Sequence, residues 1–411
     1  MTQKGTIISA PSSASGKTTV TLGLLRALKR AGIPIRSAKS GPDYIDPRFH
    51  AAASGNECVN LDAWAMSPDR IKSLATGDTP LIIEGAMGLF DGAPPNGGGS
   101  TADLARILGL PVVLVLDVAS QAQSVAAVAL GFSQLSPDVK IAGIILNKVG
   151  SPRHDKMLRR ALDPLNIPVL GSLYRQADLQ TPSRHLGLIQ AQERDDLDGF
   201  LDRAADMVAT AIDIPALMAL MGQVTPTAQS TLTLPPPAQS IAIASDAAFS
   251  FAYPHLLADW RAMGAEISFF SPLADQAPKP ADLVYLPGGY PELHAGKLAS
   301  AQIFKQGLKS ANAVYGECGG YMTMGDGLID AHGIRHEMLR LETSFAARKL
   351  HLGYRNLTPN ALWDMPLSAH EFHYATTLKS DGDPLFSAAD AEGTQLPPMG
   401  LINGSHSGSF A

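Results

Sequence analysis

The hydrophobic pattern of the first half of the chain alternates short segments with continuous, non-alternating apolar runs and longer segments that are apolar on one face. A strand that is apolar throughout is buried on both faces, as in a parallel sheet covered by helices on both sides. The pattern predicts strands over residues 6–10, 33–38, 80–84, 111–117, 140–147 and 167–173. It predicts helices from residue 17 through Leu28 and over residues 48–53, 68–75, 102–108, 121–130 and 154–165. This alternation is typical of a doubly wound α/β domain with a parallel sheet.

The second half repeats the α/β pattern after an interruption. A helical pattern over residues 193–221 gives way to a stretch rich in Thr, Gln, Ser and Pro, with three consecutive prolines at 235–237. Such a stretch has no hydrophobic period and indicates a semi-rigid linker. Strands at 240–244, 266–270, 283–286 and 313–315 and a helix at 249–263 follow. We therefore predict a first domain at 1–222, a linker at 223–238 and a second α/β domain at 239–411.

Composition limits the classes of function. The chain has 411 residues, 45% of them hydrophobic, and a formal net charge of −6. This length is sufficient for two or three hydrophobic cores. There is no block of like charges, which argues against a broad electrostatic surface for nucleic acid, so no nucleic-acid partner is expected.

Cysteine usage and the N-terminus bear on the compartment. Cys58 and Cys318 lack the spacing of a zinc cluster or a disulfide framework. The N-terminus leads directly into a strand without an apolar signal segment, and the longest apolar run, 108–116, is too short to cross a bilayer. We expect a cytoplasmic protein with no membrane partner. The oligomeric state stays open, with a homodimer as one option.

A phosphate-binding loop is predicted between the first strand and the first helix. Gly16, Lys17 and Thr18 precede the helical pattern, in the strand–loop–helix context that such a loop requires. Backbone N–H groups can ring the phosphates, the lysine can reach the terminal ones, and the threonine hydroxyl can bind Mg²⁺. Pro11 stands where the usual first glycine would be. The predicted nucleotide-binding residues here are Ser15, Gly16, Lys17, Thr18 and Thr19.

Polar residues gather where later strands end, which is where ligands bind in such sheets. Lys39 adds a cation, and Asp43 and Asp46 add carboxylates on one short loop. Phosphoryl transfer uses such groups to bind the metal and to stabilise developing charge. Alternatively, this loop is an ordinary Pro/Asp turn with solvated charges. Glu84 ends a strand and suits Mg²⁺, and Asn147 is a candidate for reading the purine edge.

The second domain contains a candidate nucleophile, Cys318, in the sequence Tyr-Gly-Glu-Cys-Gly-Gly-Tyr-Met. A strand-to-helix turn of the form Gly-x-Cys-x-Gly exposes one side chain at a helix N-terminus, which favours the thiolate. A buried structural cysteine is the alternative. Gly288 and Gly289 follow another strand and can present N–H groups as an oxyanion hole. The candidate bases, which could also be packing residues, are His370, His373 and His406.

Six segments, taken together, resemble the cobyrinic acid or hydrogenobyrinic acid a,c-diamide synthases. In that family a P-loop domain like that of dethiobiotin synthetase precedes a class I glutamine amidotransferase domain. The segments cover nearly the whole chain in the expected order: KSGPDYIDP at 39–47, EGAMGLFDG at 84–92, PSRHLGL at 182–188, DAAFSFAY at 246–253, LPGGYPE at 286–292 and YGECGGYM at 315–322.

The resemblance implies an ATP- and glutamine-dependent amidoligase of cobalamin biosynthesis. Glutamine is hydrolysed at Cys318, and ATP activates the a and c acetate carboxylates of a corrinoid as acyl phosphates that ammonia attacks. It also implies site roles. The residues that serve the nucleotide and Mg²⁺ are Lys17, Thr18, Lys39 and Glu84, and the metal ligands are Thr18, Asp46 and Glu84. The substrate is contacted by Asp43, Tyr44 and Asp46, and adenine is contacted by Asn147.

One feature departs from the family pattern. The family ends in Gly-Ser-aromatic-x-His, whose histidine activates the cysteine, and Gly408-Ser409-Phe410-Ala411 matches up to the residue before that histidine. We expect the base to lie on a short native tail beyond Ala411. His406 is the weaker alternative, and impaired glutaminase activity is the third.

Three other functions are compatible with parts of the sequence. Cobyric acid synthases amidate other corrin side chains, but they lack the KSGPDYIDP form. A P-loop ATPase switch with a degenerate amidotransferase domain would need no base. A cysteine hydrolase would leave the phosphate-binding loop unexplained.

Overall fold

The computed structural model describes residues 3–411, apart from 176–182, 185–186, 189, 225–232, 330–334, 337–338, 345–349 and 380–381. The chain divides into two compact units, Met1–Leu232 and Thr233–Ala411. Each unit is described by itself. The predicted linker at 223–238 spans this division, and Gly222–Gln223 at its start pairs with the first strand.

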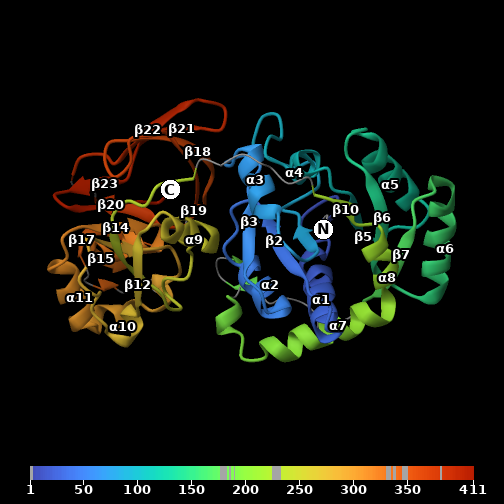
Figure 1. The fold of residues 1–411 in the computed structure, drawn as a ribbon, viewed down its shortest axis with the longest axis horizontal. Coiled ribbons are helices and arrows are strands. Elements are labelled where there is room, and N and C mark those ends of the chain that lie inside the picture. Colours follow the sequence, from blue (N-terminus) through green and yellow to red (C-terminus); the bar gives the residue numbers. More distant parts are fainter. Residues whose placement is uncertain are drawn as a thin grey trace. The chain divides into compact units, whose positions relative to one another are not determined.

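The first unit is built on one sheet with the strand order β3-β2-β4-β1-β5-β6-β7, in which neighbouring strands are parallel (Figure 1). β10 adds an antiparallel pair to β1. The chain runs from β1 through β2 to β3 at one edge, returns to β4 beside β1 and continues through β5, β6 and β7 on the other side, so its direction changes beside β1, where ligands typically bind. The strands are β1 (Lys4–Ser9), β2 (Arg36–Ser40), β3 (Cys58–Leu61), β4 (Leu81–Glu84), β5 (Val112–Asp117), β6 (Ile141–Val149), β7 (Val169–Tyr174) and β10 (Gly222–Gln223).

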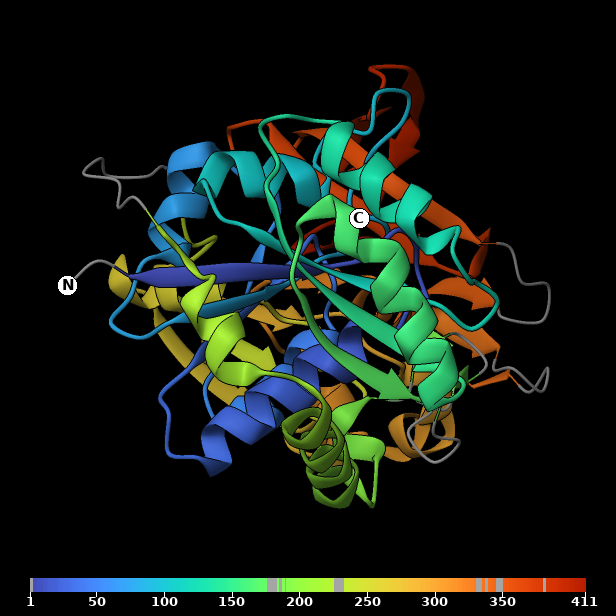
Figure 2. The same ribbon diagram turned by 90° about the vertical axis from the view of Figure 1, so that its right-hand side faces the viewer.

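Helices cover both faces of this sheet (Figures 1 and 2). Ile71, Leu104 and Leu158 of α3, α4 and α6 join one buried cluster, and Leu24 and Phe200 of α1 and α7 join the other. The fold therefore confirms the doubly wound prediction. The helices are α1 (Lys17–Arg30), α2 (Asp46–Ser54), α3 (Pro68–Ala75), α4 (Thr101–Leu108), α5 (Val125–Gln134), α6 (Pro152–Leu162), α7 (Leu197–Ala211) and α8 (Ile214–Ala219), with 3₁₀ turns at Asp163–Leu165 and Ala191–Glu193.

Two predictions for the first unit were wrong. The single helix expected at 193–221 is broken between α7 and α8. Ile212 is extended, and the Asp213 side chain accepts a bond from Ala216 N at 2.9 Å, with Pro215 in the first turn of α8. A capping aspartate followed by proline starts a new helix. The short edge strand β3, with polar Asn60 among its four residues, was not predicted.

The second unit has a sheet with the order β12-β11-β13-β14-β24-β23, parallel from β12 to β24 and antiparallel between β24 and β23. Trp260 of α9 packs on one face, and Leu298 and Phe304 of α10 and α11 pack on the other. The elements are β11 (Ser240–Ala244), α9 (Pro254–Ala262), β12 (Glu266–Phe270), β13 (Leu283–Leu286), α10 (Ala295–Ser300), α11 (Gln302–Lys309), β14 (Val314–Glu317), α12 (Gly319–Thr323), β23 (Leu401–Asn403) and β24 (His406–Ser409), with 3₁₀ turns at Pro272–Ala274 and Pro291–Leu293.

The C-terminal part of this unit is an addition that the hydrophobic pattern did not predict. Two small sheets have the orders β19-β18-β21-β22 and β16-β15-β17-β20. Their strands are β15 (Asp326–Ile329), β16 (Arg335–His336), β17 (Leu339–Ser344), β18 (His351–Pro359), β19 (Leu367–His373), β20 (Thr376–Lys379), β21 (Phe386–Asp390) and β22 (Gln395–Met399). The helix expected at 249–263 begins only at Pro254, because Tyr253 before it is extended.

Two further sequence predictions, the segment 182–188 and the lack of a membrane-spanning segment, can be compared with the structure only over the residues that it describes. Of the segment 182–188, Ser183–Arg184 and Gly187–Leu188 form the paired strands β8 and β9, whereas Pro182, His185 and Leu186 lie outside the described residues. Among the residues that the structure describes, no helix is both long enough and apolar enough to cross a membrane.

Candidate functional site

The loop between β1 and α1 has the geometry of a phosphate-binding loop. Gly16 has a left-handed backbone (φ 94°) and directly precedes the helix. A Cβ at Gly16 would lie 2.1 Å from Asn147 Nδ2, so a side chain does not fit there. The Lys17 ammonium reaches back over the loop to Ser12 O at 3.1 Å and Met87 O at 2.5 Å. The lysine is thus held by carbonyl oxygens that a terminal phosphate can replace.

Asn147, at the end region of β6, is placed against this loop. Its Nδ2 donates to Ser15 O at 2.9 Å, and its Oδ1 accepts from Lys148 N at 3.0 Å. The asparagine therefore connects β6 to the backbone of the phosphate-binding loop. Its predicted contact with adenine stays a prediction.

Glu84 at the end of β4 is the centre of a fully buried charge cluster. Its Oε1 accepts from Thr18 Oγ1 at 2.6 Å and from Lys39 Nζ at 2.9 Å. Burial acts to raise the pKa of Glu84, but Lys39 and His50 outweigh it and hold that pKa well below its usual range. The carboxylate is ionised and lies directly beside the phosphate-binding loop, as the sequence predicted.

His50 on α2 completes this cluster and was missed by the sequence analysis. Its Nε2 lies 2.6 Å from Glu84 Oε2, and its Nδ1 lies 3.5 Å from Cys58 Sγ. Burial acts to lower the pKa of His50, whereas the contacts with Cys58 and Glu84 raise it to about 10. The signal that could have found it is position: His50 lies one helical turn after Asp46, so both face the same side of α2.

Asp46 at the start of α2 faces the same cluster. Its Oδ2 accepts from Lys39 Nζ at 2.5 Å, while its buried Oδ1 has no hydrogen-bond partner among the described residues. Burial raises the pKa of Asp46 to about 7, although Lys39 acts in the opposite direction. A buried, unpartnered carboxylate oxygen needs a ligand. Asp46, Thr18 and Glu84 supply the oxygen donors that Mg²⁺ prefers, so the residues present fit the ion.

Asp43 and Tyr44 shape the loop that leads into α2. Asp43 Oδ1 accepts from Ile45 N at 2.7 Å, and its Oδ2 lies 3.9 Å from Lys39 Nζ. Asn60 of β3 donates to Asp43 O at 2.7 Å, so the unpredicted edge strand holds this loop in place. Tyr44 is half-buried. Their predicted substrate contacts stay predictions.

Cys318 occupies a sharp turn between β14 and α12. Its backbone is strained, with φ 46° and ψ −107°, and its N–H donates to Ser409 O at 2.8 Å. A Cβ at Gly320 would lie 1.8 Å from Leu286 O, so the turn packs directly on β13. A strained backbone at one residue, flanked by closely packed glycines, is typical of a nucleophile elbow.

The predicted oxyanion residues lie beside this elbow. A Cβ at Gly288 would lie 3.4 Å from Cys318 Cβ, and a Cβ at Gly319 would lie 3.0 Å from Gly289 N. The structure therefore brings the two glycines after β13 to the cysteine. Their N–H groups are candidates for stabilising an oxyanion at the attacked carbonyl.

The environment of the thiol keeps it protonated. Withdrawal from water and the carboxylate of Glu292 raise the pKa of Cys318 to about 12, against the opposing bond from Gly319 N. The N–H at the start of the helix acts in the direction that the sequence predicted, but burial and the neighbouring carboxylates outweigh it and leave the pKa raised. The helix is only five residues long, and Glu317 and Glu371 add to the opposing negative charge.

The structure does not place the predicted histidine bases at the thiol. His406 lies opposite Val314 on the neighbouring parallel strand. Val314 precedes Cys318 by four residues, and four residues of extended strand span about 13 Å. His373 uses Nδ1 toward Ala375 O at 3.0 Å and Nε2 toward Glu371 Oε1 at 2.8 Å. His370 lies on the other face of β19, because neighbouring strand residues alternate.

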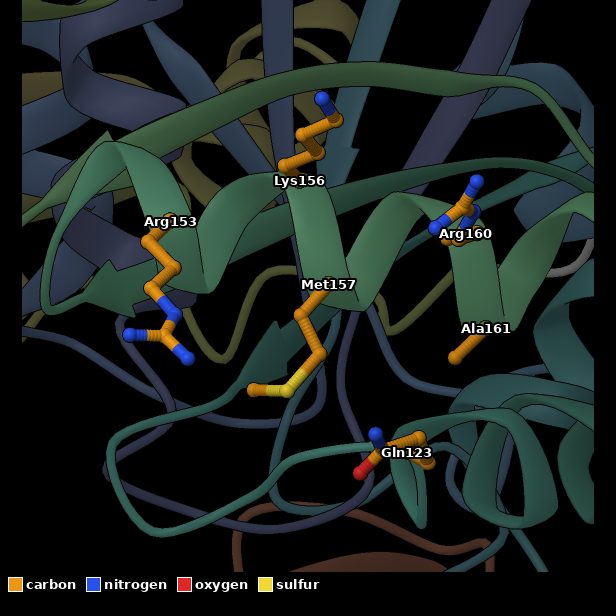
Figure 3. A pocket seen from close by; sticks show the side chains of 6 residues that line it. All are labelled: Gln123, Arg153, Lys156, Met157, Arg160 and Ala161. Atoms are coloured by element: carbon orange, nitrogen blue, oxygen red, sulfur yellow. The ribbon is translucent and has the colours of Figure 1, made fainter.

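A separate pocket of about 400 Å³ lies along α6 (Figure 3). Met157 extends toward Gln123 there, and the lining includes three cations, Arg153, Lys156 and Arg160, of which Lys156 and Arg160 point away from Met157. All three cations are exposed. Exposed cations on one face of a surface helix are usually solvated, so we assign no ligand to this pocket.

Comparison with known proteins identifies both units. Residues 6–189 match the family model described as the CobQ/CobB/MinD/ParA nucleotide binding domain, and residues 240–411 match the CobB/CobQ-like glutamine amidotransferase domain.

Curated relatives extend over almost the whole chain. A hydrogenobyrinate a,c-diamide synthase of Brucella anthropi is 56% identical over 427 residues, covering 99% of this chain and 97% of the relative. The proteins of the same name from Mesorhizobium japonicum and Rhizobium meliloti are each 51% identical, covering 100% and 99% of this chain and 98% of each relative. The resemblance inferred from the six segments is confirmed, and the chain belongs to the hydrogenobyrinate a,c-diamide synthase family of glutamine-hydrolysing amidating enzymes.

Proposed function

We propose that this chain converts the a- and c-acetate carboxylates of hydrogenobyrinic acid to amides, with glutamine as the nitrogen source and ATP as the activating co-substrate. The observation that carries the proposal is the presence of two different sites on one chain. One is the phosphate-binding loop beside the Glu84 cluster, and the other is the cysteine elbow beside Gly288 and Gly289. Amide synthesis requires an activated carboxylate and a nitrogen donor, and these sites supply one each.

The first unit activates the substrate carboxylate. Lys17 and the N–H groups around Gly16 bind the phosphates, and Lys39 offsets the charge that develops during transfer of the terminal phosphoryl group. Thr18, Asp46 and Glu84 hold Mg²⁺, which neutralises phosphate charge when bound. The carboxylate becomes an acyl phosphate, a far better electrophile. Attack by ammonia on its carbonyl forms the C–N bond and releases inorganic phosphate.

The second unit supplies ammonia. The Cys318 sulfur attacks the side-chain amide of glutamine, and the N–H groups at Gly288 and Gly289 stabilise the resulting oxyanion. Ammonia leaves, and water hydrolyses the thioester to glutamate. Because the pKa of Cys318 is raised to about 12, the proton of the thiol must be removed as the sulfur attacks and delivered to the amide nitrogen, which leaves as ammonia. Both ATP and glutamine are cytoplasmic metabolites, and we propose the cytoplasm as the compartment.

The test is the amidation of hydrogenobyrinic acid followed by mass spectrometry. Wild-type protein with Mg-ATP and glutamine should give a monoamide and then a diamide. Cys318→Ala should lose glutamine-driven turnover by about 10³-fold or more, because the covalent nucleophile is gone, and should keep ammonia-driven turnover. Lys17→Ala should lose both synthetic activities and retain glutamine hydrolysis.

A parallel assay with cobyrinic acid tests the choice of macrocycle. The name shared by the relatives favours the metal-free ring, so we expect hydrogenobyrinic acid to react faster. If neither ring gains an amide with glutamine or with ammonia, the proposed function is incorrect.

A further inference from the structure

Three side chains that could hold a metal ion lie together on one face of the β18–β19 hairpin. His351 pairs directly with His373 across the two strands, and Glu371 precedes His373 by two residues. Residues two apart on a strand, and residues directly opposite each other, share a face of the sheet. The ligand atoms of these three side chains all lie within 4.8 Å of one another.

The two most buried members are held in place by neighbouring groups. The His373 Nδ1 lies 3.0 Å from Ala375 O, so the ring has a natural partner for an Nδ1 proton. The Glu371 Oε2 accepts from Arg355 Nε at 3.0 Å and from Nη2 at 2.7 Å. Arg355 can reach the carboxylate because residue 353 is glycine. A Cβ at this position would lie 2.7 Å from the guanidinium of Arg355. Such outer contacts are typical of groups that orient metal ligands.

The His373 Nε2 and the Glu371 Oε1 face each other, and the tautomer of the ring decides whether this contact is a hydrogen bond or a pair of facing lone pairs. When the proton sits on His373 Nδ1, its Nε2 presents a lone pair, and Glu371 Oε1 lies 2.8 Å from it. Both side chains are largely buried, with 6% and 11% of their surface exposed. Two acceptors at this distance in a buried place require a cation or a shared proton between them.

We propose that His351, Glu371 and His373 bind one divalent transition-metal ion, with zinc as the leading candidate. Two imidazoles and one carboxylate suit zinc and its neighbours, whereas magnesium and calcium prefer oxygen donors. Metal–ligand distances of about 2.0–2.2 Å put the ligand atoms of one ion about 3–4 Å apart. The rings of His351 and His373 are stacked, with centroids 4.7 Å apart and planes 2° from parallel, so half-buried His351 must turn out of this stack to direct a ring nitrogen at the shared ion. The proposal is independent of the proposed function, because it names neither substrate nor reaction.

The metal site would hold in place the residues that pack beside Cys318. The His373 ring stacks on Phe410, with centroids 3.9 Å apart, and the carbonyl of Phe372 lies 4.0 Å from Cys318 Sγ. Ser409, the residue before Phe410, accepts a hydrogen bond from the Cys318 N–H through its carbonyl oxygen. Cys318 is not part of the cluster, so the ion would position the hairpin and take no direct part in the chemistry.

The experiment measures metal binding by the full chain in a Cys318→Ala background, so that this thiol cannot bind the probe. Protein dialysed against a chelator and then saturated with Mg²⁺ is titrated with Zn²⁺, and separately with Co²⁺ while the visible spectrum is recorded. We expect one equivalent of Zn²⁺ per chain, and Co²⁺ bands that Zn²⁺ removes. His351→Ala should weaken this binding by at least about 10–100-fold, the usual cost of disturbing a metal site.

His370→Ala is the matched control, because it removes an imidazole from the other face of the same strand. It should bind Zn²⁺ as the parent does. The melting temperature is a second readout, which shows whether the His351→Ala variant is folded. Zn²⁺ should raise the melting temperature of the parent and of His370→Ala, and should leave that of folded His351→Ala unchanged. The proposal is overturned if the parent binds no Zn²⁺ tightly, or if His351→Ala binds it as well as the parent does.

Discussion

At the scale of single residues, the nucleotide site depends on how one carboxylate is surrounded. Glu84 is fully buried, and Thr18, Lys39 and His50 together occupy both of its oxygens. An isolated buried carboxylate would be very costly, so these contacts are what allow it to remain ionised. His50 fixes Oε2 and leaves Oε1 on the side of Thr18, where the metal is proposed to bind.

The contribution of His50 to stability should depend on pH. Its folded pKa is about 10, above the value of 6.5 for a free histidine, so its stabilisation is fully present below about pH 6.5 and is lost as the pH rises toward 10. His50→Gln should therefore lower the free energy of unfolding by on the order of 3 kcal/mol at pH 6, and by clearly less at pH 9.5. Urea denaturation at several pH values measures the difference. A difference that does not change with pH would show that the ring is not a cation in the folded protein.

Asp46 should determine the affinity for Mg²⁺. Asp46→Asn keeps the size of the side chain and removes the charge of the unpartnered Oδ1, so the Mg²⁺ concentration for half-maximal ammonia-driven amidation should rise about 10–100-fold. Mn²⁺ binding, measured directly by electron paramagnetic resonance, should weaken in parallel. The control is Asp117→Asn, since both oxygens of Asp117 are already bonded, to Ala119 N and Lys148 Nζ. Equal metal dependence of the two variants would argue against Asp46 as a ligand.

At the scale of elements, the sequence predicted the strands of the parallel sheets well and their surroundings less well. Strands such as β4 and β5 are apolar at every position before their final carboxylate, so burial on both faces is visible in the pattern. β3 is short and polar at Asn60, and β18 alternates irregularly, so neither has a periodic signal. Glu84 could be predicted because it ends a predicted strand, and Cys318 because it lies in the glycine-rich turn after one. His50 was missed because only its position one turn after Asp46 pointed to it, and its role comes from a tertiary contact between α2 and β4.

The elbow element should be sensitive to one added methyl group. A Cβ at Gly320 would lie 1.8 Å from Leu286 O, so Gly320→Ala must displace α12 from β13. We expect a loss of stability of about 1–3 kcal/mol and a larger loss in glutamine-driven than in ammonia-driven amidation, because only the former uses Cys318. Gly131→Ala on α5 is the matched control. Nothing lies within 4 Å of its added Cβ, and alanine favours a helix by about 1 kcal/mol. Equal losses in both reactions would place the damage outside the elbow.

At the scale of the whole molecule, two chemistries occur on one chain, and the product of one is the nucleophile of the other. Each unit has its own parallel sheet, and each site lies at the carboxyl end of its strands. The units therefore have the means to fold and act separately, while the proposed reaction requires both. Three of the six sequence segments lie in each unit, and all of them except 182–188 lie at strand ends or adjoining loops of the two parallel sheets.

Coupling of the two chemistries can be measured by mixing two inactive variants. Lys17→Ala can only hydrolyse glutamine, and Cys318→Ala can only use ammonia. Ammonia that enters bulk water below neutral pH becomes ammonium, which is not a nucleophile. An equimolar mixture with glutamine at pH 6.5 should therefore form product at a small fraction of the wild-type rate, and addition of ammonium chloride at higher pH should restore the Cys318→Ala rate. If the mixture instead matches the wild type at pH 6.5, ammonia released into solution is sufficient, and the two activities share a chain without depending on it.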